Sequence, residues 1–267
     1  MVGQLTLDQH IGVRIPGGQP NSCRKRDGMR IAIVSDIHGN LNALEAVITA
    51  LNSDAPDLVL HGGDLAHGGA HPVEVVDRIR ELGWRGVLGN TDELLWRSES
   101  LPEAAEASPG LRNLVAPIQQ MASWTREQLG QQRLDWLSAL PLSINVGTLA
   151  VVHASPASCW TSPLATAPDP DLRSTFEPLG AAVASYGHIH TAFTRKLDRM
   201  TVANSGSAGM SLDGDPRASY LLIDGATIQV RRIEYDLERE IRAVTASRMP
   251  HADWTARIIR SAKPEMP

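Results

Sequence analysis

Cysteine and aromatic residues are both scarce in this chain of 267 residues. The two cysteines, Cys23 and Cys159, cannot supply a disulfide framework or a four-cysteine zinc site, so we interpret both as thiols in a reducing compartment. Aromatic residues make up only 4% of the chain, whereas hydrophobic residues make up 42%. The core is therefore expected to consist mainly of valine, isoleucine, leucine and alanine.

Long hydrophobic runs and excess positive charge are also missing. No apolar run reaches the roughly 18 residues of a membrane-spanning helix, and no basic segment followed by a hydrophobic run marks an export signal. We therefore expect a cytoplasmic protein without a membrane partner. The formal net charge of -5 argues against a general nucleic-acid-binding protein. Bound divalent cations could still create an anion-binding site in an acidic protein.

Two regions are distinguished by their patterns. Residues 1–28 show no clear periodicity and include the basic run Arg24-Lys25-Arg26, so they are predicted to form a loose N-terminal extension. Met29 directly precedes a strand-like run and could be the natural start. Residues 29–267 are predicted to form a single domain.

Strand and helix signals alternate in the first part of this domain. Short apolar runs predict strands at 30–34, 57–60 and 84–88, and periodic patterns between them predict two helices. Asn40 is the expected N-cap of the first helix, and Pro72 lies in the first turn of the second. This βαβαβ order is typical of an α/β protein with helices on the faces of a sheet.

The second part has a less regular pattern. The stretch 93–140 is predicted to be helical and to form a cap-like insertion over the site. Strands are predicted at 149–152 and 182–186, with a proline-rich loop over 156–178 between them. The pair Asp224-Gly225 between two β-like runs predicts a hairpin.

Side chains that bind metals follow each of five predicted strands. In chain order they are Asp36 and His38, Asp64, Asn90, His153, and His188 with His190. Ligands of open α/β sheets bind at the carboxyl ends of the strands, so we expect these side chains to converge. This mixture of oxygen and nitrogen ligands suits manganese, iron, zinc, nickel or cobalt better than calcium or magnesium.

Each motif alone has a simpler explanation. An aspartate after a strand is usually a turn or capping residue, and a buried histidine is usually a hydrogen-bonded core residue. The His188-x-His190 pair is more informative, because alternate residues of a strand point to the same face. A sixth segment, Asn204 to Ser207, either lines the substrate site through backbone amides or is a plain turn. The chance occurrence of the whole set is improbable.

The order of these motifs resembles that of the calcineurin-like metallophosphoesterases over residues 29 to about 233. The motifs are Asp-x-His, Gly-Asp, Gly-Asn, His and Gly-His-x-His. The resemblance implies a four-layer α/β/β/α sandwich of two mixed sheets with a dinuclear metal site, and small single-domain bacterial phosphodiesterases are the closest in plan. It also implies a set of ligands: Asp36, His38 and His190 for one metal, Asn90, His153 and His188 for the other, and Asp64 as the bridge.

Thr91 departs from the pattern of this family. Many members have a histidine after the Gly-Asn pair, which is thought to contact phosphate and to help protonate the leaving group, although the small bacterial branch often lacks it. A hydroxyl is a poor acid near neutral pH, so the hydrolysis of esters with poor leaving groups should be slowed most. His67 and His71 are candidate substitutes, although either could be a loop histidine without a role. Asp92 is expected to orient Asn90 or to cap the next helix.

The stretch from Gly63 to Gly68 also departs from one branch of the family, because it lacks the arginine of the Gly-Asp-x-x-Asp-Arg motif. The protein serine/threonine phosphatases and the dinucleoside tetraphosphatases have this arginine, which grips phosphate. Its absence argues against both activities.

The sequence therefore predicts a phosphodiesterase of small phosphate esters with two divalent transition metals, manganese first among them. A hydroxide that bridges the metals would attack phosphorus. The expected catalytic residues are Asn90, Asp64, His153, Thr91 and His67. A nuclease or cyclic-nucleotide phosphodiesterase is one alternative, although few aromatic and basic residues argue against long nucleic acids. A catalytically weak metal-binding scaffold is the other.

Overall fold

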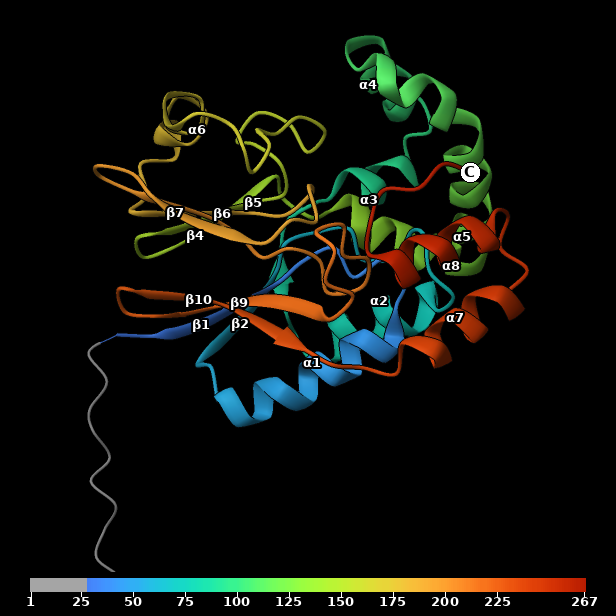
Figure 1. Ribbon diagram of the computed structural model, residues 1–267, viewed down its shortest axis with the longest axis horizontal. Coiled ribbons are helices and arrows are strands. Elements are labelled where there is room, and N and C mark those ends of the chain that lie inside the picture. Colours follow the sequence, from blue (N-terminus) through green and yellow to red (C-terminus); the bar gives the residue numbers. More distant parts are fainter. Residues whose placement is uncertain (1–27) are drawn as a thin grey trace, which may run out of the picture.

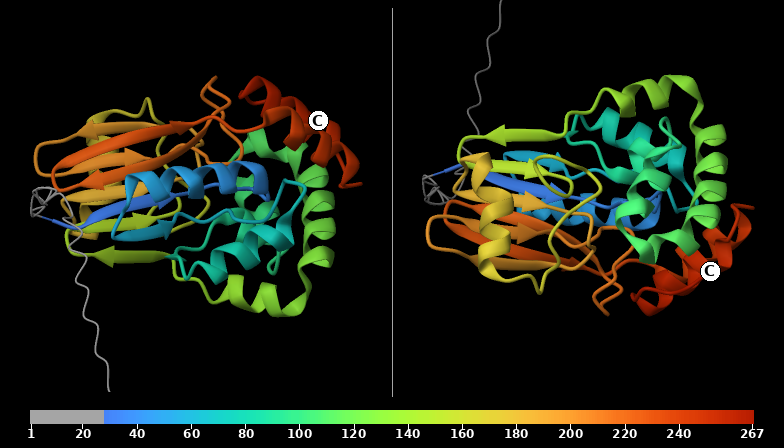
Figure 2. Two further views of the ribbon diagram at one scale, coloured as in Figure 1. Left: turned by 90° about the horizontal axis from the view of Figure 1, so that it is seen from below. Right: turned by 90° about the horizontal axis from the view of Figure 1, so that it is seen from above.

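The computed structural model describes residues 28–267. The predicted extension 1–28, with Cys23 and the basic run 24–26, therefore lies outside the described residues except for Gly28. Two sheets are stacked face to face, and helices cover their outer faces (Figure 1). A further group of helices lies at one end of the sandwich (Figure 2).

The first sheet has five strands in the order β10-β9-β1-β2-β3. These strands are β1 (Arg30–Val34), β2 (Leu58–His61), β3 (Arg85–Gly86), β9 (Ala218–Asp224) and β10 (Thr227–Ile233). β1 pairs in parallel with β2 and antiparallel with β9, so the sheet is mixed. The expected hairpin joins β9 and β10, whereas β3 is only two residues long and thus shorter than the predicted strand 84–88.

The second sheet also has five strands, in the order β4-β5-β6-β8-β7. They are β4 (Ser143–Val146), β5 (Leu149–Val152), β6 (Val183–Tyr186), β7 (Phe193–Lys196) and β8 (Thr201–Asn204). The three central strands are parallel, and antiparallel strands form both edges. Of these strands, the sequence patterns had predicted only β5 and β6.

Helices complete four layers. α1 (Leu41–Asp54) and α2 (Pro72–Glu81) cover the first sheet, and α6 (Asp169–Phe176) with the short 3-10 helix η2 (Glu177–Leu179) covers the second (Figure 1). The predicted α/β/β/α sandwich of two mixed sheets is therefore confirmed. The side chain of Asn40 accepts a hydrogen bond from the Ala43 N–H, which confirms the predicted N-cap of α1.

The remaining helices gather at the end of the sandwich (Figures 1 and 2). They are α3 (Asn90–Leu94), α4 (Ser100–Ala107), the 3-10 helix η1 (Pro109–Leu114), α5 (Val115–Ser138), α7 (Leu237–Ala246) and α8 (Ala252–Ser261). α5 is broken at Gly130, whose φ of 67° is not helical. No helix within residues 28–267 has both the length and the apolar composition needed to cross a bilayer.

The central strands are buried on both faces. In β1, Ile31 and Ile33 pack between the two sheets, whereas Ala32 and Val34 face α1 and α2. The alternating side chains of β9 divide in the same way, with Leu221 against the second sheet. Burial on both faces explains why these strands appear in the sequence as continuous apolar runs rather than as alternating patterns.

The prediction of a loop over 156–178 was wrong in its second half, because α6 lies there. Pro168 is the N-cap of this helix and Pro170 lies in its first turn. Proline is tolerated at these positions, since the first turn of a helix has no intrahelical partner for its N–H groups. The proline-rich composition therefore marked the start of a helix as well as a loop.

His61, at the end of β2, is fully buried and packs beside Trp136. Neither ring nitrogen has a hydrogen-bond partner among the described residues. Burial lowers the pKa of His61 to about 3, so the ring is neutral in the folded protein at ordinary pH. The unfolded chain, in contrast, binds a proton at this residue below about pH 6.5.

We therefore expect His61 to make the fold sensitive to acid. Stability is lost as pH falls below the unfolded pKa, because only the unfolded chain takes up the proton. In His61→Leu, the loss of unfolding free energy between pH 8 and pH 5 should be about 2 kcal/mol smaller than in the wild type. Urea unfolding of both proteins at the two pH values measures this difference. Equal losses would contradict the prediction.

Candidate metal centre

The backbone turns sharply at the residues that the sequence marked as ligands. Nine non-glycine residues within 28–267 have a positive φ, and five of them are candidate ligands: Asp36, His38, Asp64, His188 and His190. This left-handed conformation is uncommon, although aspartate and histidine adopt it more readily than most residues. Strain of this kind accumulates at functional sites. His188 and His190 lie in the turn after β6, as their position after the predicted strand 182–186 indicated, so the argument from alternate residues of a strand does not apply to them.

Backbone hydrogen bonds join the turns after β1 and β2. The N–H of Asp36 donates to the Gly63 carbonyl and that of His38 to the Asp64 carbonyl, both at 3.0 Å. The two turns therefore hold each other in place, and their side chains meet at the carboxyl ends of the strands.

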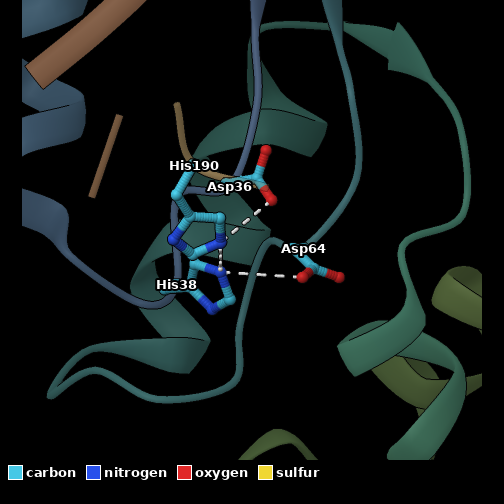
Figure 3. Close-up of side chains that lie close together, drawn as sticks. All are labelled: Asp36, His38, Asp64 and His190. Atoms are coloured by element: carbon cyan, nitrogen blue, oxygen red, sulfur yellow. Dashed lines mark hydrogen bonds and ion pairs between the residues drawn. The ribbon is translucent and has the colours of Figure 1, made fainter. Parts of the chain in front are cut away.

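Four side chains form the first group of ligands, namely Asp36, His38, Asp64 and His190. One ligand atom from each lies within 4.8 Å of all the others (Figure 3). Nε2 of His190 is 3.2 Å from Oδ1 of Asp36, and Nε2 of His38 is 3.6 Å from Oδ2 of Asp64. All four residues are buried.

Asn90, His153 and His188 form a second group beside the first. Oδ1 of Asn90 is 2.8 Å from Nε2 of His153 and 2.9 Å from Nδ1 of His188. Oδ2 of Asp64 lies 3.5 Å from Nε2 of His153, close to its distance from His38. The structure thus brings all seven expected ligands together, with Asp64 between the two groups.

The outer nitrogens of three rings face backbone carbonyls. Nδ1 of His38 lies 2.7 Å from the His67 oxygen, Nδ1 of His190 lies 2.5 Å from the Met210 oxygen, and Nδ1 of His153 lies 2.8 Å from the Gly62 oxygen. A carbonyl only accepts hydrogen bonds, so each Nδ1 carries a hydrogen. In a neutral ring, Nε2 then has its lone pair directed into the centre.

This orientation suits metal ions. Nε2 of His38 and Nε2 of His190 are 3.0 Å apart, so two neutral rings would place lone pairs against each other. A divalent cation or a proton is needed to relieve this contact. Histidines that bind metals usually donate their other N–H to a carbonyl or carboxylate, as these do. The side chains therefore fit a metal centre better than a core of hydrogen-bonded histidines.

The pKa values of the ligands also favour cations. Burial lowers the pKa of His38 and of His188 to about 4, so both are neutral at ordinary pH. Burial also lowers the pKa of His153 and His190, but carboxylates outweigh it and raise both above their usual value, with Asp64 acting most on His153 and Asp36 on His190. A cation that binds here must displace protons, so its affinity should fall in acid.

Asp92 does not orient Asn90 through any hydrogen bond of the described residues. Its carboxylate instead accepts hydrogen bonds from the N–H groups of Asp64 at 2.8 Å, Leu65 at 2.9 Å and Gly89 at 3.3 Å. The bond to Gly89 is part of the cap of α3, as expected. The other two bonds fix the backbone of the bridging ligand, a role that the sequence analysis missed.

The residues proposed to replace the missing histidine have different surroundings. His67 lines the cavity above the ligands, and its Nε2 lies 3.3 Å from the Ile118 carbonyl. Burial lowers the pKa of His67, which argues against a proton donor at neutral pH. His71 is the N-cap residue of α2 and does not line this cavity. Thr91 lines the cavity, and its N–H donates to Oδ1 of Asp64.

The segment from Asn204 to Ser207 is fully buried and does not line the cavity above the ligands. The side-chain amide of Asn204 donates to the Gly187 carbonyl at 2.6 Å, and Oγ of Ser207 donates to the Asp36 carbonyl at 2.6 Å. Of the two alternatives that the sequence left open, these contacts favour the turn over substrate-facing amides. The segment instead supports the turn after β1, which carries Asp36, and the turn after β6, which carries His188 and His190.

Comparisons with known proteins agree with this geometry. The sequence profile of the calcineurin-like phosphoesterase superfamily domain matches residues 29–227. An uncharacterized protein of Methanocaldococcus jannaschii is 29% identical over 247 residues, which are 84% of this chain and 94% of the relative. A crystal structure of a metallophosphoesterase from Sphaerobacter thermophilus has 26% identity and a TM-score of 0.72, with 88% of this chain and 100% of that chain covered. A hypothetical protein from Pyrococcus horikoshii OT3, at 18% identity, shares the fold with a TM-score of 0.74 over 88% of this chain and 99% of that chain.

The contacts of Asp92 predict a large effect of its removal. Asp92→Ala would leave three buried N–H groups without an acceptor. At about 1 kcal/mol or more for each, the free energy of unfolding should fall by about 3 kcal/mol or more, and metal affinity should fall as well. Urea unfolding in chelator and calorimetric metal titration measure the two effects. Asp135→Ala, which removes an exposed carboxylate from α5, is the control, and a similar small change in both variants would contradict the prediction.

Proposed function

The chain belongs to the calcineurin-like phosphoesterase superfamily, and on this premise we propose that it is a phosphodiesterase that uses two divalent metals to hydrolyse small phosphate esters. One observation supports the proposal most directly. Oδ2 of Asp64 lies 3.6 Å from Nε2 of His38 and 3.5 Å from Nε2 of His153. A single carboxylate oxygen thus faces both groups of ligands, as a bridge between two metals requires.

The two groups would hold one cation each. Asp36, His38 and His190 belong to the first site, Asn90, His153 and His188 to the second, and Asp64 to both. Cations bound there would neutralise phosphoryl oxygens and activate a water molecule for attack on phosphorus. The mixture of carboxylate, carboxamide and imidazole ligands favours a transition metal, with manganese as our first choice.

The protein holds the bridging carboxylate in one orientation. The N–H of Thr91 donates to Oδ1 of Asp64 at 2.9 Å, so Oδ2 remains directed at the histidines. Asp92 fixes the backbone of the same residue from the other side. Thr91 therefore positions Asp64 through its backbone, although its side chain cannot protonate a leaving group.

Thr91 and His67 are both poor proton donors at neutral pH, which limits the reaction. His67 is the imidazole that lines the cavity besides the ligands, and burial lowers its pKa. We infer that His67 contacts the substrate as a neutral group and that the alcohol departs with little help from a protein acid. Esters of acidic alcohols should therefore react fastest.

Nuclease activity is less consistent with the site. Among residues 28–267, no lysine or arginine lines the two cavities that open at the ligands. A protein that binds long nucleic acids needs cationic side chains along the path of the backbone. The scaffold alternative rests on Thr91 alone, and it does not explain why two groups of candidate ligands gather around a shared, buried carboxylate.

Metal-restored turnover tests the proposed function. Protein stripped of metal should be inactive on bis-p-nitrophenyl phosphate, and manganese, nickel or zinc should restore hydrolysis. Asp64→Asn should lower the restored kcat by roughly a hundredfold or more, because it removes the charge shared by both sites. Asp171→Asn, the same change at an exposed position of α6, should have no effect. Two metals bound per chain without any turnover would instead support the scaffold.

A histidine at position 91 should supply the missing acid. We expect Thr91→His to raise the turnover of diesters with poor leaving groups, such as diphenyl phosphate, by about tenfold or more, because general acid catalysis contributes most there. The turnover of bis-p-nitrophenyl phosphate should rise only slightly, because its leaving group needs little protonation. Thr91→Gln adds a side chain of similar reach that cannot act as an acid, and it should show no such selectivity. Equal effects of both variants on both esters would contradict the prediction.

A further inference from the structure

Two cavities meet at the candidate metal centre. The inner cavity has a volume of about 310 Å³ and the outer cavity one of about 420 Å³. Six residues line both of them: Asn90, Thr91, Leu111, Ile118, His188 and Leu212. A phosphoryl group at the ligands could therefore direct one organic substituent into each cavity. A phosphodiester has two such substituents, whereas a monoester has only one.

The walls of the inner cavity are mainly apolar. Leu114 of η1, Met121 of α5, Met210 in the turn after β8, and Trp254 and Ile258 of α8 line it above the ligands. These helices gather at the same end of the sandwich, next to the carboxyl ends of the strands (Figure 1). Segments far apart in the sequence thus enclose a hydrophobic space beside a polar centre.

The inner cavity also lacks cationic side chains. Among residues 28–267, no lysine or arginine lines it, and Glu265 is the only carboxylate there apart from the ligand Asp64. A second phosphate or carboxylate on the substrate would find no positive partner outside the metals. A charged group moved from water into such walls would lose its hydration without a compensating partner.

The outer cavity differs from the inner one. Ser108, Thr161 and Ser162 supply hydroxyl groups to its lining, beside Trp160 and Leu164. It can accept a polar substituent as well as an apolar one. The two cavities are therefore not equivalent, and the inner cavity is the more selective of the two.

We propose that the substrate is a phosphodiester with an uncharged, apolar substituent, alkyl or aryl, that fills the inner cavity. The second substituent occupies the outer cavity. This inference rests on the proposed function, because it assumes that the phosphoryl group binds at the metal ligands. It excludes nucleoside polyphosphates and other substrates with a second charged group near phosphorus.

Phosphonates test the inner cavity without a need to know the natural substrate. Each has a phosphoryl head and one organic arm, and none can be hydrolysed at its carbon–phosphorus bond by water attack of this kind. We would measure the binding of methyl-, propyl-, pentyl- and phenylphosphonate to manganese-loaded protein by calorimetry. The affinity should rise by about fourfold for each buried methylene until the cavity is full. 2-Carboxyethylphosphonate should bind more weakly than propylphosphonate, because its carboxylate finds no cationic partner in the lining of the inner cavity.

Substitutions assign the effect to the cavity. Leu114→Gln places an amide in the wall of the inner cavity. It should abolish most of the increase in phosphonate affinity with alkyl chain length. Leu111→Gln, in the wall that both cavities share, is a second variant should the first fail to fold. Leu142→Gln, the same change at an exposed leucine outside both cavities, should leave this increase intact.

The outcomes separate the two proposals. If all alkylphosphonates bind with equal affinity, or if the carboxyethyl compound binds more tightly than propylphosphonate, the proposal of an apolar substituent is refuted. This holds even if bis-p-nitrophenyl phosphate is hydrolysed. If affinity still rises with chain length as in the wild type in both Leu114→Gln and Leu111→Gln, the alkyl chain does not bind in the inner cavity. Failure of every phosphonate to bind, together with no hydrolysis by metal-loaded protein, would refute the proposed function itself.

Discussion

The position of one carboxylate, that of Asp64, is the constraint on which the rest of the site depends. It is buried, it directs Oδ2 at histidines from both groups of ligands, and its backbone is held by Asp92. Space around it is equally restricted. A Cβ atom at Gly89 would lie 2.2 Å from the Asp64 nitrogen, so only glycine allows the turn after β3 to approach so closely. These contacts hold the turns after β2 and β3 close together.

The two sheets position the candidate ligands around Asp64 in different ways. The turns after β1 and β2 in the first sheet exchange backbone hydrogen bonds and carry three carboxylate or imidazole ligands. The turns after β5 and β6 in the second sheet bring the remaining histidines from the opposite side. Because the core between the sheets is close-packed and apolar, neither sheet can shift without moving its ligands. The uncommon left-handed backbone at five ligands is stable only inside such a rigid frame.

The chemistry of the site and the shape of the cavities lead to the same class of substrate. Thr91 and the neutral His67 provide no acid, which favours an alcohol that leaves readily. The helices above the ligands provide hydrophobic walls without cations within the described residues, which favours an uncharged substituent. An acidic alcohol with an apolar body, such as an aryl group, satisfies both conditions. Under the proposed function, the helices above the candidate ligands would select the substrate, and the ends of the strands would supply the chemistry.

The order of the candidate ligands, the alternation of strands and helices around them, and the N-cap at Asn40 could be predicted from the sequence, because each of them leaves a local pattern in the chain. It did not reveal the edge strands β4 and β7, which are short and half exposed. The hydrogen bonds between Asp92 and the Asp64 backbone, and those from Asn204 and Ser207 to the ligand turns, could be found only in the folded structure. The same is true of the inner cavity, whose walls at Leu114 and Ile258 come from distant segments. Contacts between segments far apart in the chain leave no periodicity in either segment, so they become visible only once the chain is folded.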